Sequence, residues 1–290
     1  MWLGLALMAV VFNTASILAK RVKGRNSKAV IIAWWVGLLS IPVMTVMAIV
    51  SGGVGPIESG FWLPATISAL AGAITSVAMV RAYQISEMSL VAPLLNALPV
   101  FLLVSSFFIL GERPSLAGVI GVMVISFGAY YINSHRNQRL LDPFRAVLSN
   151  KGARLILAVT VVWSITNNFD KIAIQHAPVT TQMLYVCITT WLALSFYVLP
   201  RRRLRREILP TLRRHWLKLG VIAFSHSAAV LFQIMAMSIG YVSYVLAVKR
   251  LDVLLAVAVA SYLYKEKARR RRLTGAMVML GGVAIMYLQM

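Results

Sequence analysis

Long apolar stretches separated by short polar gaps fill the whole chain. Each stretch holds about 20 residues in which apolar side chains dominate, and about 20 residues of α-helix cross a hydrocarbon core. Each stretch therefore predicts one transmembrane helix. The ten predicted spans are 2–20, 29–50, 61–84, 88–110, 115–133, 154–175, 179–199, 217–239, 242–264 and 273–289.

Composition supports the same class of protein. Hydrophobic residues make up 60% of the 290 residues, charged residues make up 13%, and the mean hydropathy is +0.80. A soluble domain cannot bury this much apolar surface, so we predict an all-α integral membrane protein. The first span precedes the first basic cluster, and we expect it to be retained rather than cleaved as a signal peptide.

Basic residues occupy alternate gaps between the spans. On one side of the predicted membrane lie 25 of the 29 Lys and Arg residues, whereas the other side holds Arg113 and Lys171 only. The positive-inside rule places the side with 25 in the cytoplasm and both termini outside, as in a multi-pass bacterial or archaeal plasma-membrane protein. The same rule explains the net charge of +21 without nucleic-acid binding, for which the chain has no reader motif.

Two of these gaps carry further predictions. The run 201–206 reads RRRLRR, which fits an orientation anchor on a solvated loop or a site for anionic lipid. The segment 140–148 is predicted to form a short amphipathic helix along the inner surface of the membrane.

The second half of the chain repeats the first. At an offset of 154 residues, Trp62 aligns with Trp216 and Glu112 aligns with Glu266. A repeat of five spans is odd-numbered, so the two copies must cross the membrane in opposite directions. We therefore predict two inverted five-helix repeats, 1–133 and 154–290, joined by a cytoplasmic linker, 134–153. Inverted repeats of this kind are typical of secondary transporters.

The chain resembles the EamA family of the drug/metabolite transporter superfamily over nearly its whole length. The segments that carry the resemblance are 89–94, 110–112, 116–128, 168–171, 244–250, 264–267 and 272–276. The resemblance implies two five-helix repeats around a central cavity that is lined mainly by helices 3, 4, 8 and 9, with helices 1 and 6 nearby. Relatives are described with cytoplasmic termini, whereas the charge distribution of this chain predicts external ones.

Four charged residues lie deep inside predicted spans, where each needs a partner or a function. One interpretation is an anion-binding site, in which Lys249 and Arg250 meet a carboxylate or phosphate of the substrate. The other is an internal ion-pair network, in which Lys249 pairs with Asp252 at helical i, i+3 spacing and Arg250 pairs with Asp170. Phosphate-translocating relatives in the superfamily carry a similar Lys-Arg pair, which favours an anionic substrate.

Further polar residues fall at similar depth. We predict that Gln233, Asn167, Asn96 and Tyr244 join the substrate site. Tyr244 also fits the aromatic belt at the membrane interface. The acids Asp170 and Asp252 either couple transport to proton movement or are held charged by basic neighbours. His226 is either a proton relay or a hydrogen-bonded structural residue.

Other residues are predicted to shape the fold. Glu112 and Glu266 fit caps or loop tethers better than substrate contacts. Lys171 is expected to extend to the lipid headgroups. Ala117, Gly121 and Gly128 form a stripe of small residues that lets another helix approach closely, either within one chain or across a homodimer.

These features favour a secondary active transporter of a small polar metabolite, anionic or zwitterionic, working by alternating access in the lipid bilayer. The chain has no nucleotide-binding motif, no expected cofactor, and no metal-ligand spacing among its four histidines. We therefore expect no enzymatic activity. The alternatives are an intramembrane lipid-modifying enzyme or flippase, and a non-transporting membrane scaffold.

Overall fold

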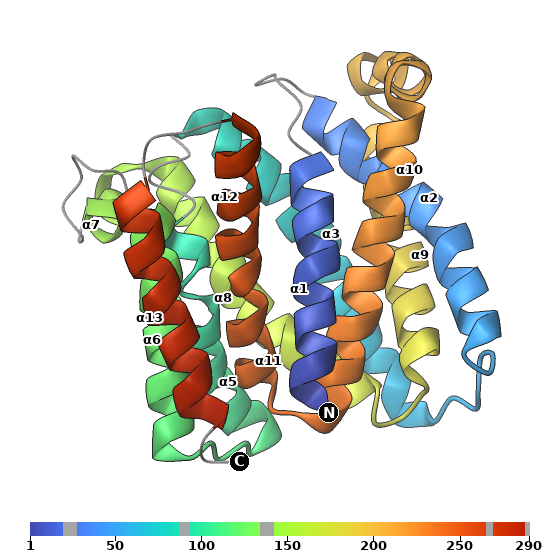
Figure 1. The fold of residues 1–290 in the computed structure, drawn as a ribbon. Helices are drawn as coiled ribbons and strands as arrows, with labels where there is room; N and C mark the ends of the chain where they lie inside the picture. The colour runs from blue at the N-terminus through green and yellow to red at the C-terminus, as the bar shows by residue number, and fades with distance from the viewer. Residues whose placement is uncertain (20–27, 87–92, 134–141, 265–268, 288–290) are drawn as a thin grey trace.

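The computed structural model describes residues 1–19, 28–86, 93–133, 142–264 and 269–287, and within them every regular element is a helix. Figure 1 shows the helices running side by side across one body, with the start of α1 and the end of α13 at the same end of the molecule. We name this the terminal end. The opposite end carries the starts of α2, α8 and α10 and is named the basic end.

The first repeat follows its predicted spans closely except the fourth, predicted over 88–110, which is interrupted at residues 96–97 before α5 begins at Leu98. Its helices are α1 (Trp2–Ala19), α2 (Lys28–Val50), η1 (Ser59–Phe61), α3 (Trp62–Ile85), α5 (Leu98–Leu110) and α6 (Leu116–Asn133). Pro99 in the first turn of α5 has no backbone N–H to donate, which favours a helix start at this position.

The second repeat repeats this order after a short amphipathic helix. That helix, α7 (Asp142–Ser149), confirms the prediction of a helix within 140–148, although residues 140 and 141 lie outside the described residues. The helices that follow are α8 (Lys151–Ala173), α9 (Val179–Val198), α10 (Arg202–Ile239), α11 (Val242–Lys249), α12 (Leu251–Tyr264) and α13 (Arg269–Tyr287).

Two boundaries in the second repeat differ from the prediction. The ninth span divides into α11 and α12 at Arg250. The eighth helix begins at Arg202 rather than at 217, and its kink lies at His215, where φ is −135° and ψ is 19°. The basic run 201–206 is therefore mostly helical rather than a loop. Leu204 is buried, and the Trp35 indole N–H donates to the Ile208 carbonyl oxygen at 2.9 Å, so this amphipathic part packs on α2.

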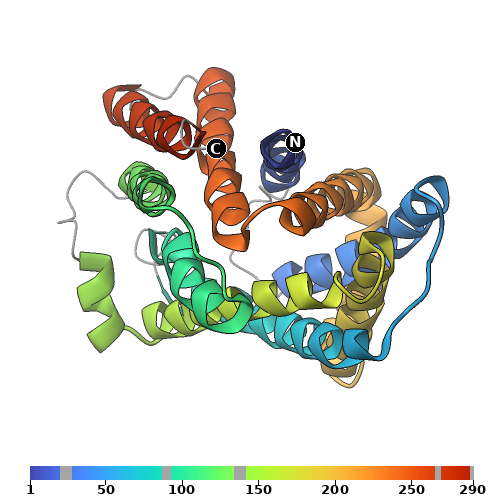
Figure 2. The ribbon, with the colours of Figure 1, turned by 90° about the horizontal axis from the view of Figure 1, so that it is seen from below.

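Contacts between the repeats obey a two-fold relation. The first helix of each repeat packs on the third helix of the other, as α1 on α10 and α8 on α3. The second helices, α2 and α9, pack on each other, and so do the fifth helices, α6 and α13. Seen along the helices, the α6–α13 pair lies at one end of an elongated cross-section and the α2–α9 pair lies at the other (Figure 2). The molecule is thus built from two inverted five-helix repeats.

Glycines allow α6 and α13 to meet closely. A methyl group added to Gly128 would lie 3.0 Å from the Gly275 carbonyl oxygen, and one added to Gly121 would lie 2.8 Å from that of Gly282. Close backbone approach of this kind is the usual role of small residues between membrane helices. The predicted stripe of small residues therefore serves packing within one chain, and the homodimer stays a prediction.

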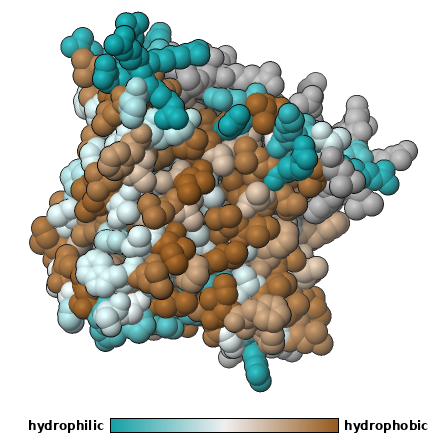
Figure 3. Space-filling model, turned by 180° about the vertical axis from the view of Figure 1, so that it is seen from behind, coloured by the Kyte–Doolittle hydropathy of each residue, from teal (hydrophilic) through white to brown (hydrophobic). Residues whose placement is uncertain are grey.

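The outer surface matches a membrane environment. Six of the described helices are long and apolar enough to span a bilayer, and two shorter apolar helices, Leu116–Ile132 and Leu273–Tyr287, accompany them. Large apolar side chains such as Phe108 and Phe196 point outward, at 78% and 81% exposure. Figure 3 shows apolar residues across the middle of the molecule and hydrophilic residues gathered at the upper, basic end.

Candidate functional site

A central cavity of about 570 Å³ lies between the two repeats. Its walls come from α2, α3, α9 and α10, and α8 contributes Asp170. Its polar lining residues are Ser40, Ser76, Tyr83, Asp170, Gln182, Thr190, His226 and Gln233. The expectation that helices 4 and 9 line the cavity is wrong for the described residues, because helices 2 and 7 (α2 and α9) stand in that place. α11 instead packs on α1, α5 and α6.

The cavity extends along the membrane normal. Ala29 and Tyr83, near the basic ends of α2 and α3, line one part of it, and Gln182, in the first turn of α9, lines the part toward the terminal end. Polar lining groups are spread along this length rather than gathered at one point. The cavity can therefore contact polar groups of a small ligand at more than one depth.

Asp170 is held by neutral donors near the terminal end of the cavity. Its Oδ1 accepts a hydrogen bond from the Ser68 hydroxyl at 2.5 Å and another from the Gln182 side-chain amide at 2.9 Å. The predicted Arg250–Asp170 pair is wrong, because Arg250 interacts electrostatically with Asp252 and Tyr83 and not with Asp170. Gln182 was missed in the sequence, although a glutamine in an apolar span is itself a signal that a buried polar group needs a partner.

Three of the predicted site residues meet in one polar cluster. The Gln233 side-chain amide donates to the Asn167 carbonyl oxygen at 3.3 Å, and the Gln233 carbonyl oxygen accepts a hydrogen bond from the Lys249 ammonium group. Asn167 in turn donates to the Trp163 backbone carbonyl at 2.7 Å. The cluster joins α8, α10 and α11, and Gln233 links it to the cavity wall. The predicted polar layer of the second repeat is present, and its role in substrate binding stays a prediction.

Arg250 and Asp252 lie on either side of the start of α12. Asp252 is 4% exposed, and its Oδ2 accepts a hydrogen bond from the Asn13 side-chain amide at 2.6 Å. It also interacts electrostatically with Arg250 and Lys249. Arg250 further interacts with Tyr83 of the cavity wall, while its Nε is buried without a hydrogen-bond partner among the described residues. An unpartnered guanidinium nitrogen this close to the cavity is a group that a ligand can satisfy.

The backbone explains why Lys249 and Asp252 do not follow continuous helical spacing. The Arg250 N–H donates to the Ala247 carbonyl, and the Val253 N–H donates to the Arg250 carbonyl, which tightens one turn between α11 and α12. The first repeat has the same interruption before α5, where the Val100 N–H donates to the Ala97 carbonyl. Ala97 and Arg250 correspond to within one residue of the repeat offset.

Interrupted helices in both halves are a feature of transporter binding sites, because they free backbone groups near the middle of the membrane. Only the second repeat places a cation at its interruption. The equivalent position in the first repeat carries the neutral Asn96.

Asn96 and Tyr244 neither line the cavity nor join the polar cluster beside it. Asn96 is 2% exposed and donates its side-chain amide to the Ala129 backbone carbonyl of α6 at 3.1 Å. Tyr244 is buried in the apolar core, and its hydroxyl lies so close to Gly118 that no Cβ would fit there. Both side chains therefore join α6 to the interrupted helices, and their assignment to the substrate site is corrected to a packing role.

His226 does lie in the cavity wall, seven residues before Gln233 on α10. This spacing corresponds to about two helical turns, so both side chains face the same space. A role in proton transfer stays a prediction. Across the described residues, no group of three or more His, Cys, Asp or Glu side chains could hold a metal ion.

An ion pair joins the two repeats at the terminal end. The Lys171 ammonium group lies 2.8 Å from Oε1 of Glu112 and donates to the Gly240 carbonyl oxygen at 2.8 Å. The Glu112 carboxylate also accepts from the Val242 N–H at the start of α11, at 3.1 and 3.2 Å. We name this the Lys171–Glu112 latch.

The latch settles two predictions from the sequence. Glu112 acts as a tether and helix cap, as predicted. The expectation that Lys171 extends to the headgroups is wrong, because a buried carboxylate lies within reach. Glu266 and Lys20, their counterparts in the repeat, lie outside the described residues.

Comparison with known proteins agrees with this architecture. A solved structure described as "Crystal structure of protein" has 13% sequence identity and a TM-score of 0.76, and the match covers 99% of this chain and 96% of that one. At this identity the likeness shows the fold alone. A search of curated proteins gives no match. The profile of the EamA-like transporter family matches residues 1–134 and 150–288, once for each repeat, and the chain therefore belongs to the EamA-like transporter family.

Proposed function

We propose that this membrane protein is a secondary active transporter that moves a small polar metabolite by alternating access. The observation that carries the proposal is the polar-lined central cavity of about 570 Å³ between two inverted repeats. Cavities of this size hold small molecules. Inverted repeats allow the cavity to open first to one side and then to the other. Membership of a family of transporters supports the same conclusion.

The substrate class follows from the charges beside the cavity. Lys249 reaches the cavity wall through Gln233, and Arg250 keeps a buried nitrogen without a hydrogen-bond partner among the described residues. A carboxylate or phosphate would satisfy these groups. Asp170 lies in the cavity lining and would face an amino group. We therefore propose an anionic or zwitterionic substrate.

Asp170 is also our candidate for coupling transport to proton movement. It lies in the cavity lining, whereas Asp252 is fixed against Asn13 away from the described lining residues. His226 lines the same cavity and is placed to exchange protons with a bound substrate or water. Asp252 fits the alternative role of a structural charge between Lys249 and Arg250.

We place the basic end in the cytoplasm and the terminal end outside, because cytoplasmic loops carry the excess of Lys and Arg. With this orientation the Lys171–Glu112 latch lies on the external side. A small epitope tag at either terminus tests the orientation. The tag should react with antibody on intact cells, and protection of the tag until the cells are permeabilised would reverse the assignment.

The transport proposal is tested by uptake and counterflow in proteoliposomes, with a panel of organic anions, amino acids, amines and nucleotides. Lys249→Ala and Arg250→Ala should each lower uptake of the preferred substrate by about tenfold or more, since a hydrogen bond to a charged group contributes roughly 1.5–3 kcal/mol. Arg213→Ala is the matched control, because Arg213 is exposed on the amphipathic part of α10. Transport of amines that is unchanged in both variants would contradict the anion proposal.

A further inference from the structure

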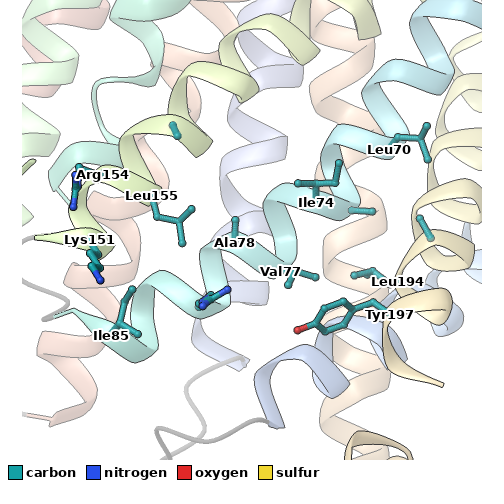
Figure 4. Close-up of a pocket in the computed structure, with 14 residues that line it drawn as sticks. Leu70, Ile74, Val77, Ala78, Ile85, Lys151, Arg154, Leu155, Leu194 and Tyr197 are labelled. Carbon is teal, nitrogen blue, oxygen red and sulfur yellow. The ribbon is translucent and has the colours of Figure 1, made fainter. Parts of the chain in front are cut away.

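A second hollow lies on the outer surface, and its lining residues differ in chemical character from those of the central cavity. It is a groove of about 920 Å³ between α3, α8 and α9 (Figure 4). Apolar side chains form its walls, and Ile74 among them is 70% exposed. Since the groove faces outward at the level of membrane-spanning helices, the molecules that can fill it in a bilayer are lipids.

Cations gather at one end of this groove. Arg81 comes from the last turns of α3, and Lys151 and Arg154 come from the first turn of α8. Figure 4 shows Lys151 and Arg154 beside Ile85 at one end, with Leu70 at the far end. All three cations are exposed, and the described lining residues include no acid. This end of the groove is the basic end of the molecule, where lipid headgroups lie.

Local packing fixes how the ends of α3 and α8 that carry these cations lie together. The Ser86 hydroxyl, just after α3, bonds the side-chain oxygen of Asn150, which also accepts from the Gly152 and Ala153 N–H groups and so caps α8. A Cβ at Gly152 would lie 3.0 Å from the Ala82 carbonyl oxygen, so only glycine lets α3 and α8 come this close. The backbones that carry Arg81 and Lys151 are therefore held close together.

A hydroxyl completes the opposite wall. Figure 4 shows the Tyr197 side chain reaching from α9 into the groove with its hydroxyl toward α3. The Arg201 guanidinium lies 3.6 Å from the centre of the Tyr197 ring and also donates to the Tyr197 backbone carbonyl. The ring is therefore held in place, and its hydroxyl can donate to a phosphate or ester oxygen.

We propose that this groove binds one anionic phospholipid of the leaflet at the basic end. Its phosphate and negative headgroup lie among Arg81, Lys151 and Arg154, and an acyl chain runs along the apolar wall past Val77 and Ile74. No acid among the described lining residues opposes the three cations, and their charge selects an anionic lipid over a zwitterionic one, whose own cation would be repelled. Because α3 belongs to the first repeat and α8 and α9 belong to the second, the bound lipid bridges the two repeats.

Native mass spectrometry of the detergent-purified protein tests this directly. Phosphatidylglycerol and phosphatidylcholine with identical acyl chains are titrated, and the fraction of protein that retains lipid is measured. We expect tighter retention of phosphatidylglycerol in the natural chain. Each cation near a membrane surface contributes about fivefold to anionic-lipid affinity. Arg81→Gln with Arg154→Gln should therefore lower phosphatidylglycerol retention by roughly 25-fold and leave phosphatidylcholine unchanged.

Matched variants separate the groove from general attraction to a basic surface. Arg213→Gln with Arg214→Gln removes two exposed cations from the same end of the molecule but outside the groove, and should change retention little. Arg81→Lys with Arg154→Lys keeps the charge and should keep the preference. Ile74→Trp fills the apolar wall without changing charge and should weaken both lipids. Elution as a single folded species in size-exclusion chromatography is required of every variant.

Three results would overturn the proposal. The first is equal retention of the two lipids by the natural chain. The second is equal loss in the groove and control variants, which would show general surface electrostatics. The third is displacement of phosphatidylglycerol by millimolar glycerol phosphate with no effect of Ile74→Trp, which would show that a soluble anion is sufficient.

Discussion

Breaking the Lys171–Glu112 latch should destabilise the protein, and the cost of each single substitution should depend on how deeply the remaining partner is buried. The Glu112 side chain is 5% exposed and the Lys171 side chain is 16% exposed. Among the described residues, Lys171→Met leaves this nearly buried carboxylate with only the Val242 N–H as donor, at a cost of about 3 kcal/mol. Glu112→Gln leaves Lys171 with the Gly240 carbonyl and some water, so its cost is smaller, about 1–2 kcal/mol. Lys171→Met should therefore be the more damaging single change.

The double variant measures the pair itself. Once Lys171 is gone, neutralising Glu112 removes an unpaired buried charge, so the two costs should fall short of additivity by about 2 kcal/mol. The free energy of unfolding is measured in mixed micelles by circular dichroism. Glu58→Gln is the control, because Glu58 pairs with His176 at 2.8 Å but its side chain is 70% exposed, and its cost should stay within about 0.5 kcal/mol. Additive costs, or a larger cost for Glu112→Gln, would refute the reasoning.

Three further variants test the packing and the site. Gly128→Ala places a Cβ 2.5 Å from Met279 and should cost about 1–3 kcal/mol of unfolding free energy. The control Gly220→Ala meets nothing within 4 Å and should be neutral or stabilising. Equal effects of the two variants would contradict the α6–α13 contact. Gln233→Leu removes the partner of Lys249 and should lower transport about tenfold in proteoliposomes, and unchanged transport would remove this cluster from the site. Asp170→Asn should abolish the pH dependence of uptake, and transport with undiminished pH dependence would exclude it as the proton coupler.

The sequence predicts the membrane spans, the inverted repeats and the tether at Glu112. The length of an apolar stretch and the charges in the gaps determine these features without information about distant contacts. A stretch of 20 apolar residues crosses a membrane whatever its neighbours do. The same dependence on hydrophobicity alone placed the start of α10 too late in the sequence. Its basic residues suggested a loop, yet Leu204 and Ile208 recur at helical spacing and pack on α2.

The candidate site was predicted only in part, because depth in the membrane does not fix direction. Asn96 and Asn167 lie in similarly apolar spans, yet the first bonds a carbonyl of α6 and the second joins the cluster beside the cavity. Pairing of Lys249 with Asp252 was judged from ideal helical spacing, and the interruption at Arg250 is a backbone feature that residue types alone do not reveal. Gln182 needed knowledge of its neighbour Asp170, 12 residues away in the sequence and on another helix.

The fourth helix is interrupted at the same place in both halves, at Ala97 and at Arg250, but only the second half carries a positive charge there. If the halves were identical, the inward-facing and outward-facing forms would be related by a two-fold rotation about an axis in the membrane plane and would have the same energy, since each form would exchange the conformations of the two halves. A guanidinium on one side only removes that degeneracy. Under the proposed alternating access, we expect the difference between Asn96 and Arg250 to bias which side the empty protein faces, and replacing either residue should shift that preference.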